Sequence, residues 1–485
     1  MVGGNGGSIY ILGNDASIID TNLSRSHAKV NGGIIYIAGQ NAIVNGSSLM
    51  KCSADENGGA IYVAGFNATI ENSTFGMTNA SGSVINGVHT NGNGGAIYVQ
   101  GDSASIIDSR FNITIAVHGS GGAIYVGGLN TNISGINASI SQAPNGQGGS
   151  IYVDCVNTTI SDSDLTIAHA GKEGGSVYIK GDYSKIINST ITRTSSDTYG
   201  GAVYIDAVNA TIEDSHFAMN NATVSGGAIY ILGVNANVKN STFNLTFART
   251  SPTSYATTNL GGAIYIKGNN ANISFSNFTN SFAYQGGIIY LESNYCTIVN
   301  STFDKGFALW DGGAIFSYLG AHTSLSNSTF TNNLAEYDGG AIFWHGGESS
   351  VYNSVDRCTF INNTAVAKGT FSSGVRTTRG GGALYWSEKG SYGSVTNSKF
   401  INNSVQAIKG KADGGAILWD TCSHGIIDNC TFYGNFITTQ DYDGNGIWVQ
   451  GGAMLLRPTT NFTISDCIFE NSWSDKEGGA LYVSN

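Results

Sequence analysis

Gly58-Gly59-Ala60-Ile61-Tyr62-Val63, then Asn67-Ala68-Thr69-Ile70, then Asn72-Ser73-Thr74-Phe75, make up a unit that recurs along the whole chain. Its Gly-Gly pair returns 17 times, mostly at intervals of 25 to 27 residues. Such a period is too short for a helix pair, and the leucine pattern of leucine-rich repeats is missing. The segments between the glycines are short, alternating and β-branched, which favours strands. We therefore predict an all-β fold: a right-handed, single-stranded parallel β-helix of about 17 coils, each with about 26 residues and three strands.

Alternation within the unit predicts which side chains form the core. Strand faces alternate with a period of two residues, so Ile61 and Val63 should point inward and stack on their equivalents in neighbouring coils. The first and third residues after each Gly-Gly pair, Ala60 and Tyr62 here, should share the outer face. The Gly-Gly pair itself should mark a corner, where a positive φ or a close backbone approach excludes a β-carbon.

A second recurring position lies three residues before the Phe of each unit, and it is usually Asn or Asp, as at Asn72, Asp108, Asp162 and Asp214. These residue types tolerate the left-handed backbone region and bond to nearby backbone. We interpret the position as a bend between strands, in preference to a ligand site.

Composition excludes several classes of protein. Only 11% of the 485 residues are charged and 68 are Gly, but 41% are hydrophobic and recur in register, which argues against disorder. The 22 basic residues are scattered and the net charge is −11, so no nucleic-acid partner is expected. No apolar run reaches the ~20 residues of a membrane span.

A repeat of this kind predicts one continuous β-helix over 1–485, with regular coils over 1–310 and larger coils with longer loops over 311–485. Repeat sequence reaches both ends without atypical capping repeats. We expect the chain to be part of a longer protein whose signal and anchor lie elsewhere.

Two motifs resemble those of known surface proteins. Gly339-Gly340-Ala341-Ile342 with Phe360 to Asn363 is similar to the motif pair of the chlamydial polymorphic outer-membrane proteins. The fuller unit, with Asn-Ala-Thr-Ile and Asn-Ser-Thr-Phe, more closely resembles the adhesin-like β-helix repeat proteins of methanogenic archaea. The resemblance covers nearly the whole chain, and it implies secretion, display on the cell surface and adhesion.

No catalytic site is predicted. Several polysaccharide lyases and hydrolases share the β-helix fold, and glycoside cleavage needs two carboxylates at a fixed separation. The bend acids Asp108, Asp162 and Asp214 are mostly separated by coils that carry Asn, and the eight His show no metal-ligand spacing. We expect no cofactor. Asp311 and Asp338 precede Gly-Gly pairs on adjacent coils and either share a calcium ion or, as we favour, are hydrogen-bonded turn residues.

Cysteines and sequons give further expectations. Seven Cys without regular pairing argue against a disulfide framework. Cys358, Cys430 and Cys467 replace the Ser of Asn-Ser-Thr-Phe and should be buried thiols in one stack. A surface glycoprotein would offer N-glycosylation at some of its many sequons, and the candidates are Asn67, Asn188, Asn209 and Asn300.

Two features exceed what the fold needs and are candidate binding surfaces. The first is a ladder of outward-facing Tyr. It is either a flat platform that binds sugars or another copy of the chain, or a stabilising stack partly covered by loops. Its candidate residues are Tyr62, Tyr98, Tyr125, Tyr152, Tyr178, Tyr204 and Tyr230. The second is a set of insertions between the Phe strand and the next Gly-Gly pair, at 76–93, 244–260, 361–380, 401–413 and 433–450. Insertions at one repeat position emerge on one face of a solenoid, often the binding face. Its candidate residues are Phe371, Arg376, Arg379, Tyr442 and Trp448.

These observations predict a non-catalytic, extracellular, adhesin-like protein that contacts a host or neighbouring cell-surface protein or glycan through its loop face. A self-associating stalk, sheath or filament component is the first alternative. A polysaccharide lyase or hydrolase is the second.

Overall fold

The computed structural model describes residues 4–85, 88–90, 92–250, 256–347, 350–368, 380–387, 390–407, 412–439, 449–457 and 460–484. They form two compact units, unit 1 (Met1–Asn237) and unit 2 (Val238–Asn485). Strands are the only regular elements among these residues, so none of the described segments is a helix that could cross a membrane. The predicted continuity of the solenoid over 1–485 stays a prediction.

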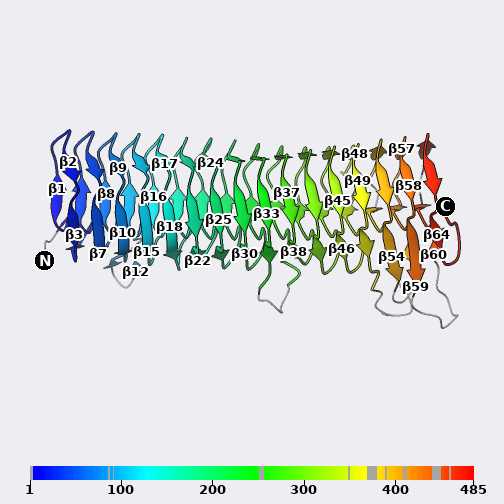
Figure 1. Cartoon of the computed structure of the whole chain (residues 1–485), viewed down its shortest axis with the longest axis horizontal. Coiled ribbons are helices and arrows are strands. Elements are labelled where there is room, and N and C mark those ends of the chain that lie inside the picture. Colours follow the sequence, from blue (N-terminus) through cyan, green and yellow to red (C-terminus); the bar gives the residue numbers. More distant parts are fainter. Residues whose placement is uncertain are drawn as a thin grey trace. The chain divides into compact units, whose positions relative to one another are not determined.

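Each coil contributes one strand to each of three parallel sheets (Figure 1). In the coil quoted above these strands are β8 (Ile61–Val63), β9 (Thr69–Glu71) and β10 (Thr74–Ala80). They pair with β13 (Ile97–Val99), β14 (Ser105–Ile107) and β15 (Arg110–Ala116) of the next coil, and the register joins equivalent residues of the repeat. The same three-sheet pattern is found in unit 2. The predicted right-handed parallel β-helix is therefore confirmed.

The third strand of the coil bends in the middle, which the sequence did not indicate. In β7 (Ser48–Ala54), β10, β15 and β18 (Asn137–Ala143) the strand continues through the bend. In later coils it divides in two, as in β21 (Asp164–Thr166) and β22 (His169–Ala170). The residue at this bend has a positive φ, 54° at Met77 and 53° at Ile167. We call this position the mid-strand bend.

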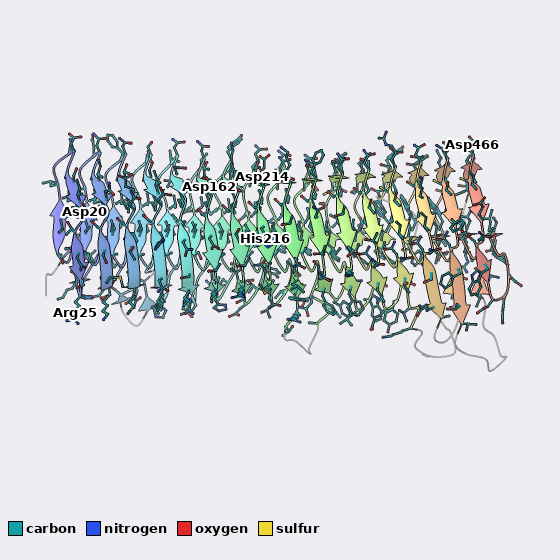
Figure 2. The ribbon with its side chains drawn as sticks, in the orientation of Figure 1. Asp20, Arg25, Asp162, Asp214, His216 and Asp466 are labelled. Carbon is teal, nitrogen blue, oxygen red and sulfur yellow. The ribbon has the colours of Figure 1, made fainter. Side chains whose placement is uncertain are left out.

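The predicted Asn/Asp bend is confirmed. Asn72, Asp108 and Asp162 have φ values of 48°, 46° and 51°, in the left-handed region that Asn and Asp tolerate. The side chains also join neighbouring coils, since Nδ2 of Asn188 donates to Oδ1 of Asp162 at 2.7 Å. Asp162 and Asp214 are labelled on the ribbon of unit 1 in Figure 2.

Both glycines of the corner pair are required, for different reasons. The first glycine has a positive φ, 65° at Gly58. A β-carbon on the second, Gly59, would overlap the carbonyl oxygen of Gly95 and the backbone of Asn79. The corner therefore needs one glycine for its backbone conformation and the other for close packing against the neighbouring coil.

The core follows the predicted alternation with one exception. Ile61, Val63 and Ile70 are at most 1% exposed, and Phe75 stacks on the Phe of the next coil with ring centroids 4.9 Å apart. Ala60, however, is fully buried, so the prediction that the first residue faces outward is wrong. The amides of Ala60 and Ile61 both donate to the carbonyl oxygen of Ala96, at 2.8 and 2.9 Å. Two residues thus oppose one acceptor, as in a β-bulge, and this interrupts the alternation.

Unit 2 has a bulkier core in its last coils. Trp344, Trp386 and Trp419 occupy the fourth position after their Gly-Gly pairs and are at most 1% exposed. Their ring centroids lie 4.7 and 4.5 Å apart along the stack. In unit 1 the same position is Ile or Val, so these coils of unit 2 have larger side chains there.

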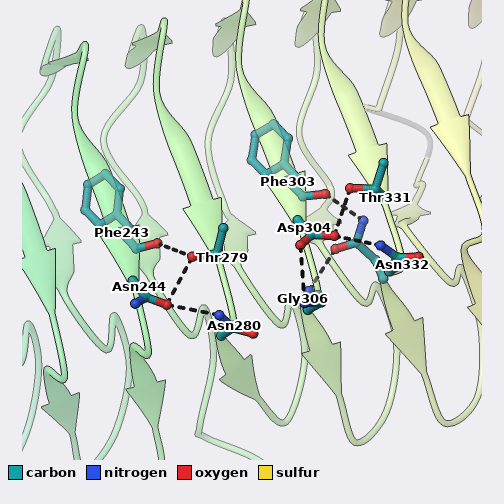
Figure 3. Close-up of polar contacts among 11 residues, drawn as sticks. Phe243, Asn244, Thr279, Asn280, Phe303, Asp304, Gly306, Thr331 and Asn332 are labelled. Atoms are coloured by element: carbon teal, nitrogen blue, oxygen red, sulfur yellow. Dashed lines mark hydrogen bonds and ion pairs between the residues drawn. The ribbon is translucent and has the colours of Figure 1, made fainter.

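The Phe-x-x-Asn motif of unit 2 forms a buried asparagine ladder just after the mid-strand bend. Nδ2 of Asn333 donates to Oδ1 of Asn363, and Nδ2 of Asn363 donates to Oδ1 of Asn403, both at 2.9 Å. Asn435 continues the ladder. Figure 3 shows an outer set of bonds at the same bend, where Thr331 and Asn332 both donate to Oδ1 of Asp304 at 2.9 Å. Side-chain amides thus link successive coils both inside and outside the bend.

Candidate binding surfaces

The predicted Tyr ladder exists as a stack, but little of it is open to solvent. In unit 1 consecutive rings are 4.7 to 5.1 Å apart between centroids, with interplanar angles of 14° or less. Only 6 to 9% of the surface of five ladder residues is exposed: Tyr62, Tyr152, Tyr178, Tyr204 and Tyr230. Tyr98 and Tyr125 are half-buried. This geometry favours a stabilising stack, and a binding role of these residues stays a prediction.

The phenol groups of the ladder have partners within the chain. The Tyr125 hydroxyl donates to Asp154 at 2.9 Å, and the same carboxylate pairs with Lys180 at 2.7 Å. The Tyr62 hydroxyl donates to Oε1 of Gln100 at 2.7 Å. Burial raises the pKa of Tyr152 to about 12, and it raises the pKa of Tyr62 and Tyr125 further. The phenols therefore stay protonated at neutral pH, and those of Tyr62 and Tyr125 bond to residues at the edge of the stack.

The five candidate residues of the insertions, Phe371, Arg376, Arg379, Tyr442 and Trp448, lie outside the described residues. A described contact lies at the start of one insertion, where Nζ of Lys368 is 2.6 Å from Oε1 of Glu336 in the preceding coil. The insertion at 361–380 thus contacts the preceding coil near the end of its third strand, just beyond the mid-strand bend.

An aromatic cluster on the same side was missed by the sequence analysis. Tyr284, Trp310 and Tyr337 each stand two residues before a Gly-Gly pair, on three consecutive coils between the insertions 244–260 and 361–380. The Trp310 ring centroid is 5.7 Å from that of Tyr284 and 4.0 Å from that of Tyr337. Trp310 is 37% exposed. The signal was present in the sequence, because none of the other 14 Gly-Gly pairs has an aromatic residue at this position. We call these three residues the loop-side cluster.

Carboxylates lie beside the loop-side cluster. Asp311 is 6% exposed, and its Oδ1 accepts the backbone amide of Asp338 at 3.2 Å. Oδ1 of Asp338 accepts the amide of Gly380 at 2.8 Å. Burial raises the pKa of Tyr284, and the nearby Asp311 carboxylate raises it further.

These bonds agree with the turn-residue interpretation of Asp311 and Asp338 that the sequence favoured over calcium binding. Within the part of the chain that the structure describes, no three His, Cys, Asp or Glu side chains are grouped so as to hold a metal ion.

The carboxylates at the bends are held in coil-to-coil bonds. Hydrogen bonds from Asn188 and Ser161 lower the pKa of Asp162, opposite to the shift that a general acid needs at neutral pH. A second carboxylate set, missed from the sequence, surrounds Arg457 in unit 2: Nη2 lies 2.6 Å from Oδ2 of Asp413, and Nη1 lies 3.8 Å from Oδ1 of Asp420. Asp413 is 1% exposed, so this ion pair lies within the coil stack.

The candidate glycosylation residues occupy left-handed bends. Asn67, Asn188, Asn209 and Asn300 have φ values of 45° to 57°. All are exposed except Asn209, which is half-buried. Nδ2 of Asn67 donates to Oδ1 of Asn41 at 2.9 Å, so glycosylation there would replace a coil-to-coil hydrogen bond.

The predicted burial of the thiols is confirmed for Cys358 and Cys430 but not for Cys467. All seven cysteines are free, and Cys358 and Cys430 are 1% exposed while Cys467 is half-buried. Each Sγ lies 3.1 to 3.5 Å from the carbonyl oxygen two residues earlier, the acceptor that the Ser hydroxyl of other coils uses. Burial raises the pKa of Cys358 and of Cys430 to about 12.

Comparison with known proteins agrees with the fold. A family model described as a right handed beta helix region matches residues 262–485. No curated protein sequence matches the chain.

Similar solved structures include alginate lyase AlyF-OU02 in complex with G6, with 12% identity, a TM-score of 0.45, and coverage of 77% of this chain and 86% of that one. The surface adhesin PfbA of Streptococcus pneumoniae has 11% identity, a TM-score of 0.34, and coverage of 83% and 85%. A tailspike double mutant of E. coli bacteriophage HK620, in complex with a pentasaccharide, has 12% identity, a TM-score of 0.34, and coverage of 99% and 74%. At these values the likeness concerns the fold, and no functional conclusion about this chain rests on it.

Proposed function

We propose that this chain is a non-catalytic, extracellular, adhesin-like protein that attaches to a glycan or protein of a host or neighbouring cell surface. The attachment uses the loop-bearing side of unit 2. The proposal includes the expected relation to adhesin-like β-helix repeat proteins of methanogenic archaea. The single observation that carries it is the loop-side cluster, with Trp310 37% exposed between Tyr284 and Tyr337.

The fold itself does not require aromatic residues at these positions. The equivalent residues of other coils include Glu56, Lys172 and Asn259, which are polar. Tyr and Trp give a large, rigid contact area at a low cost in conformational entropy, and they are enriched among the residues that dominate protein interfaces. Ring surfaces beside carboxylates also suit sugars, which present apolar faces and hydroxyl groups. The cluster thus adds a contact surface to coils that would be stable without it.

The position of the cluster supports the same conclusion. It occupies three coils without insertions, between two long insertions at the same position of the repeat. Insertions of a solenoid emerge on one face, which is often the binding face. A partner that touches the insertions would therefore also reach Trp310.

The test is the Trp310→Ala variant in a saturable binding assay on cells and on a glycan array. Loss of a central Trp typically costs about 2 kcal/mol or more, so we expect the Kd to rise at least about 30-fold. Tyr183→Asn is the matched control, because Tyr183 is 54% exposed but lies in unit 1, outside the loop-side cluster. Equal binding by wild type and Trp310→Ala would contradict the proposed surface.

Two further readouts address the alternatives. New reducing or unsaturated ends in a polysaccharide incubated with the protein would contradict the non-catalytic part of the proposal. Ordered filaments in negative-stain microscopy, without saturable binding to cells or glycans, would favour the stalk or sheath alternative.

A further inference from the structure

A second aromatic array lies on another corner of unit 2, where the chain passes from the Gly-Gly strand to the second strand of the coil. Five consecutive coils place an aromatic ring there: Tyr295, His322, Tyr352, Tyr392 and His424. Successive ring centroids are 4.7, 5.3, 4.9 and 4.6 Å apart, with interplanar angles of 7° to 21°. We call this row the Tyr/His row.

Unlike the predicted Tyr ladder, the Tyr/His row is open to solvent. Tyr295, Tyr352 and Tyr392 are 55%, 54% and 46% exposed. His322 is exposed and His424 is half-buried. Because stacking covers the ring faces, the row presents ring edges and phenol hydroxyls outward at the spacing of the coils.

The fold does not call for aromatic residues at this corner. All five have φ values of 55° to 60°, in the left-handed region. In unit 1 the same bend is mostly Asn or Asp, as at Asn67, Asn130 and Asn157, which adopt this region more readily. Stacking of half-exposed rings stabilises the fold by about as much as the left-handed conformation of a non-Asn residue destabilises it. Stability alone therefore gives no reason for five aromatic substitutions in succession.

A row of hydroxyl groups runs beside the aromatic rings. The residue two positions later in each coil lies on the outer face of the second strand, and in four coils it is Thr or Ser: Thr297, Ser324, Ser354 and Ser394. These residues are exposed or half-buried, while the residue between each pair is buried. Neither row contains Lys, Arg, Asp or Glu.

We propose that the Tyr/His row and the adjacent hydroxyl row form a binding site for an uncharged polysaccharide, bound lengthwise along the coils of unit 2. A surface that repeats every 4.6 to 5.3 Å over five coils matches an extended polymer better than a compact ligand. The ring edges contact the apolar parts of the sugar units, and the Tyr, Ser and Thr hydroxyls both donate to and accept from sugar hydroxyls. Without Lys or Arg in either row, the site has no permanent positive charge for an acidic polymer or a nucleic acid.

The test uses the full chain with a double substitution, Tyr352→Asn with Tyr392→Asn. Asn is the residue that other coils carry at this bend, so the left-handed conformation is retained. Tyr183→Asn is the matched control, because Tyr183 is an exposed Tyr at the same bend whose neighbours in adjacent coils are Asn157 and Asn209. Affinity electrophoresis in gels containing dextran, mannan or hydroxyethylcellulose measures binding, with alginate as the acidic polymer.

We expect wild type and Tyr183→Asn to be retarded by at least one uncharged polymer and not by alginate, and the double variant to bind at least tenfold more weakly. The proposal is overturned if wild type binds none of the uncharged polymers, if it prefers alginate, or if the double variant binds like wild type. A separate measurement avoids any folding defect of the variant: nitration of Tyr352 and Tyr392 in wild type, mapped by mass spectrometry, should fall when the polymer is bound. Equal nitration with and without the polymer would also overturn the proposal, whereas the Trp310→Ala result would leave it unaffected.

Discussion

The second glycine of most corner pairs is sensitive to substitution, because two backbones meet there. A methyl group at Gly59 would overlap the Gly95 carbonyl oxygen and the backbone of Asn79, neither of which can rotate away. We expect Gly59→Ala to lower the free energy of unfolding by about 1–3 kcal/mol or more, the range of overpacking. The guanidinium midpoint of unfolding measures this loss. Gly13→Ala is the control, since no atom lies within 4 Å of a β-carbon at Gly13; equal midpoints for the two variants would refute the explanation.

Residue preferences predicted some bends and failed at others. The Gly-Gly corner and the Asn72 bend were predictable because Gly and Asn adopt a positive φ readily. The mid-strand bend was not, because Ile113 and Ile140 have positive φ values of 57° and 55° although β-branched residues avoid this region. Their conformation is imposed by coils paired in register on both sides, which a single residue's preference cannot indicate.

At the scale of elements, the asparagine ladder of unit 2 joins neighbouring coils through buried side-chain amides that have no access to water. Asn363 is fully buried; its Nδ2 donates to the Phe330 carbonyl and to Asn403, and its Oδ1 accepts the amide and the side chain of Asn333. Truncation leaves these partners unsatisfied, each at a cost of about 1–3 kcal/mol. We therefore expect Asn363→Ala to destabilise the protein by several kcal/mol, measured by chemical denaturation. Thr297→Ala, on an exposed strand position, should change the midpoint little; a similarly small change for Asn363→Ala would show that the ladder is not stabilising.

Strand order and register were predictable from the period of the sequence, but the detail of each strand was not. Equivalent residues pair across coils, as Tyr62 with Tyr98, because one repeat is one turn of the solenoid. The buried position of Ala60 depends on a bulge, which forms through hydrogen bonds to the next coil and interrupts the alternation that the sequence predicts.

At the scale of the whole molecule, the candidate surfaces depend on how much of each aromatic column the coils leave open. Tyr152 and Tyr295 both belong to in-register aromatic stacks, but 8% of Tyr152 is exposed and 55% of Tyr295. Sequence periodicity indicates that such residues stack. Exposure depends on whether the residue is in a strand or at a corner, which follows from the coil geometry. For that reason the sequence pointed to the ladder of Tyr152 and missed the row of Tyr295.

The buried thiols and phenols together predict that stability declines at alkaline pH. Burial raises the pKa of Cys296 to about 11, and of Cys52, Cys358 and Tyr152 to about 12, from ordinary values of 9.0 for Cys and 10.0 for Tyr. Above pH 9 the unfolded chain therefore releases protons that the folded chain retains, so the free energy of unfolding falls as the pH rises. Each such group lowers it by about 1.4 kcal/mol per pH unit between its two pKa values.

Denaturant midpoints measured from pH 7 to 11 should be level up to about pH 8 and then decline steeply. Cys358→Ser is the matched variant, because Ser occupies this position in most coils and donates the same bond. It should reduce the slope above pH 9 by about 1.4 kcal/mol per pH unit. A slope unchanged by the substitution would mean that this thiol does not contribute to the alkaline instability. A free energy of unfolding that stays level up to pH 11 would contradict the raised pKa values of all these thiols and phenols.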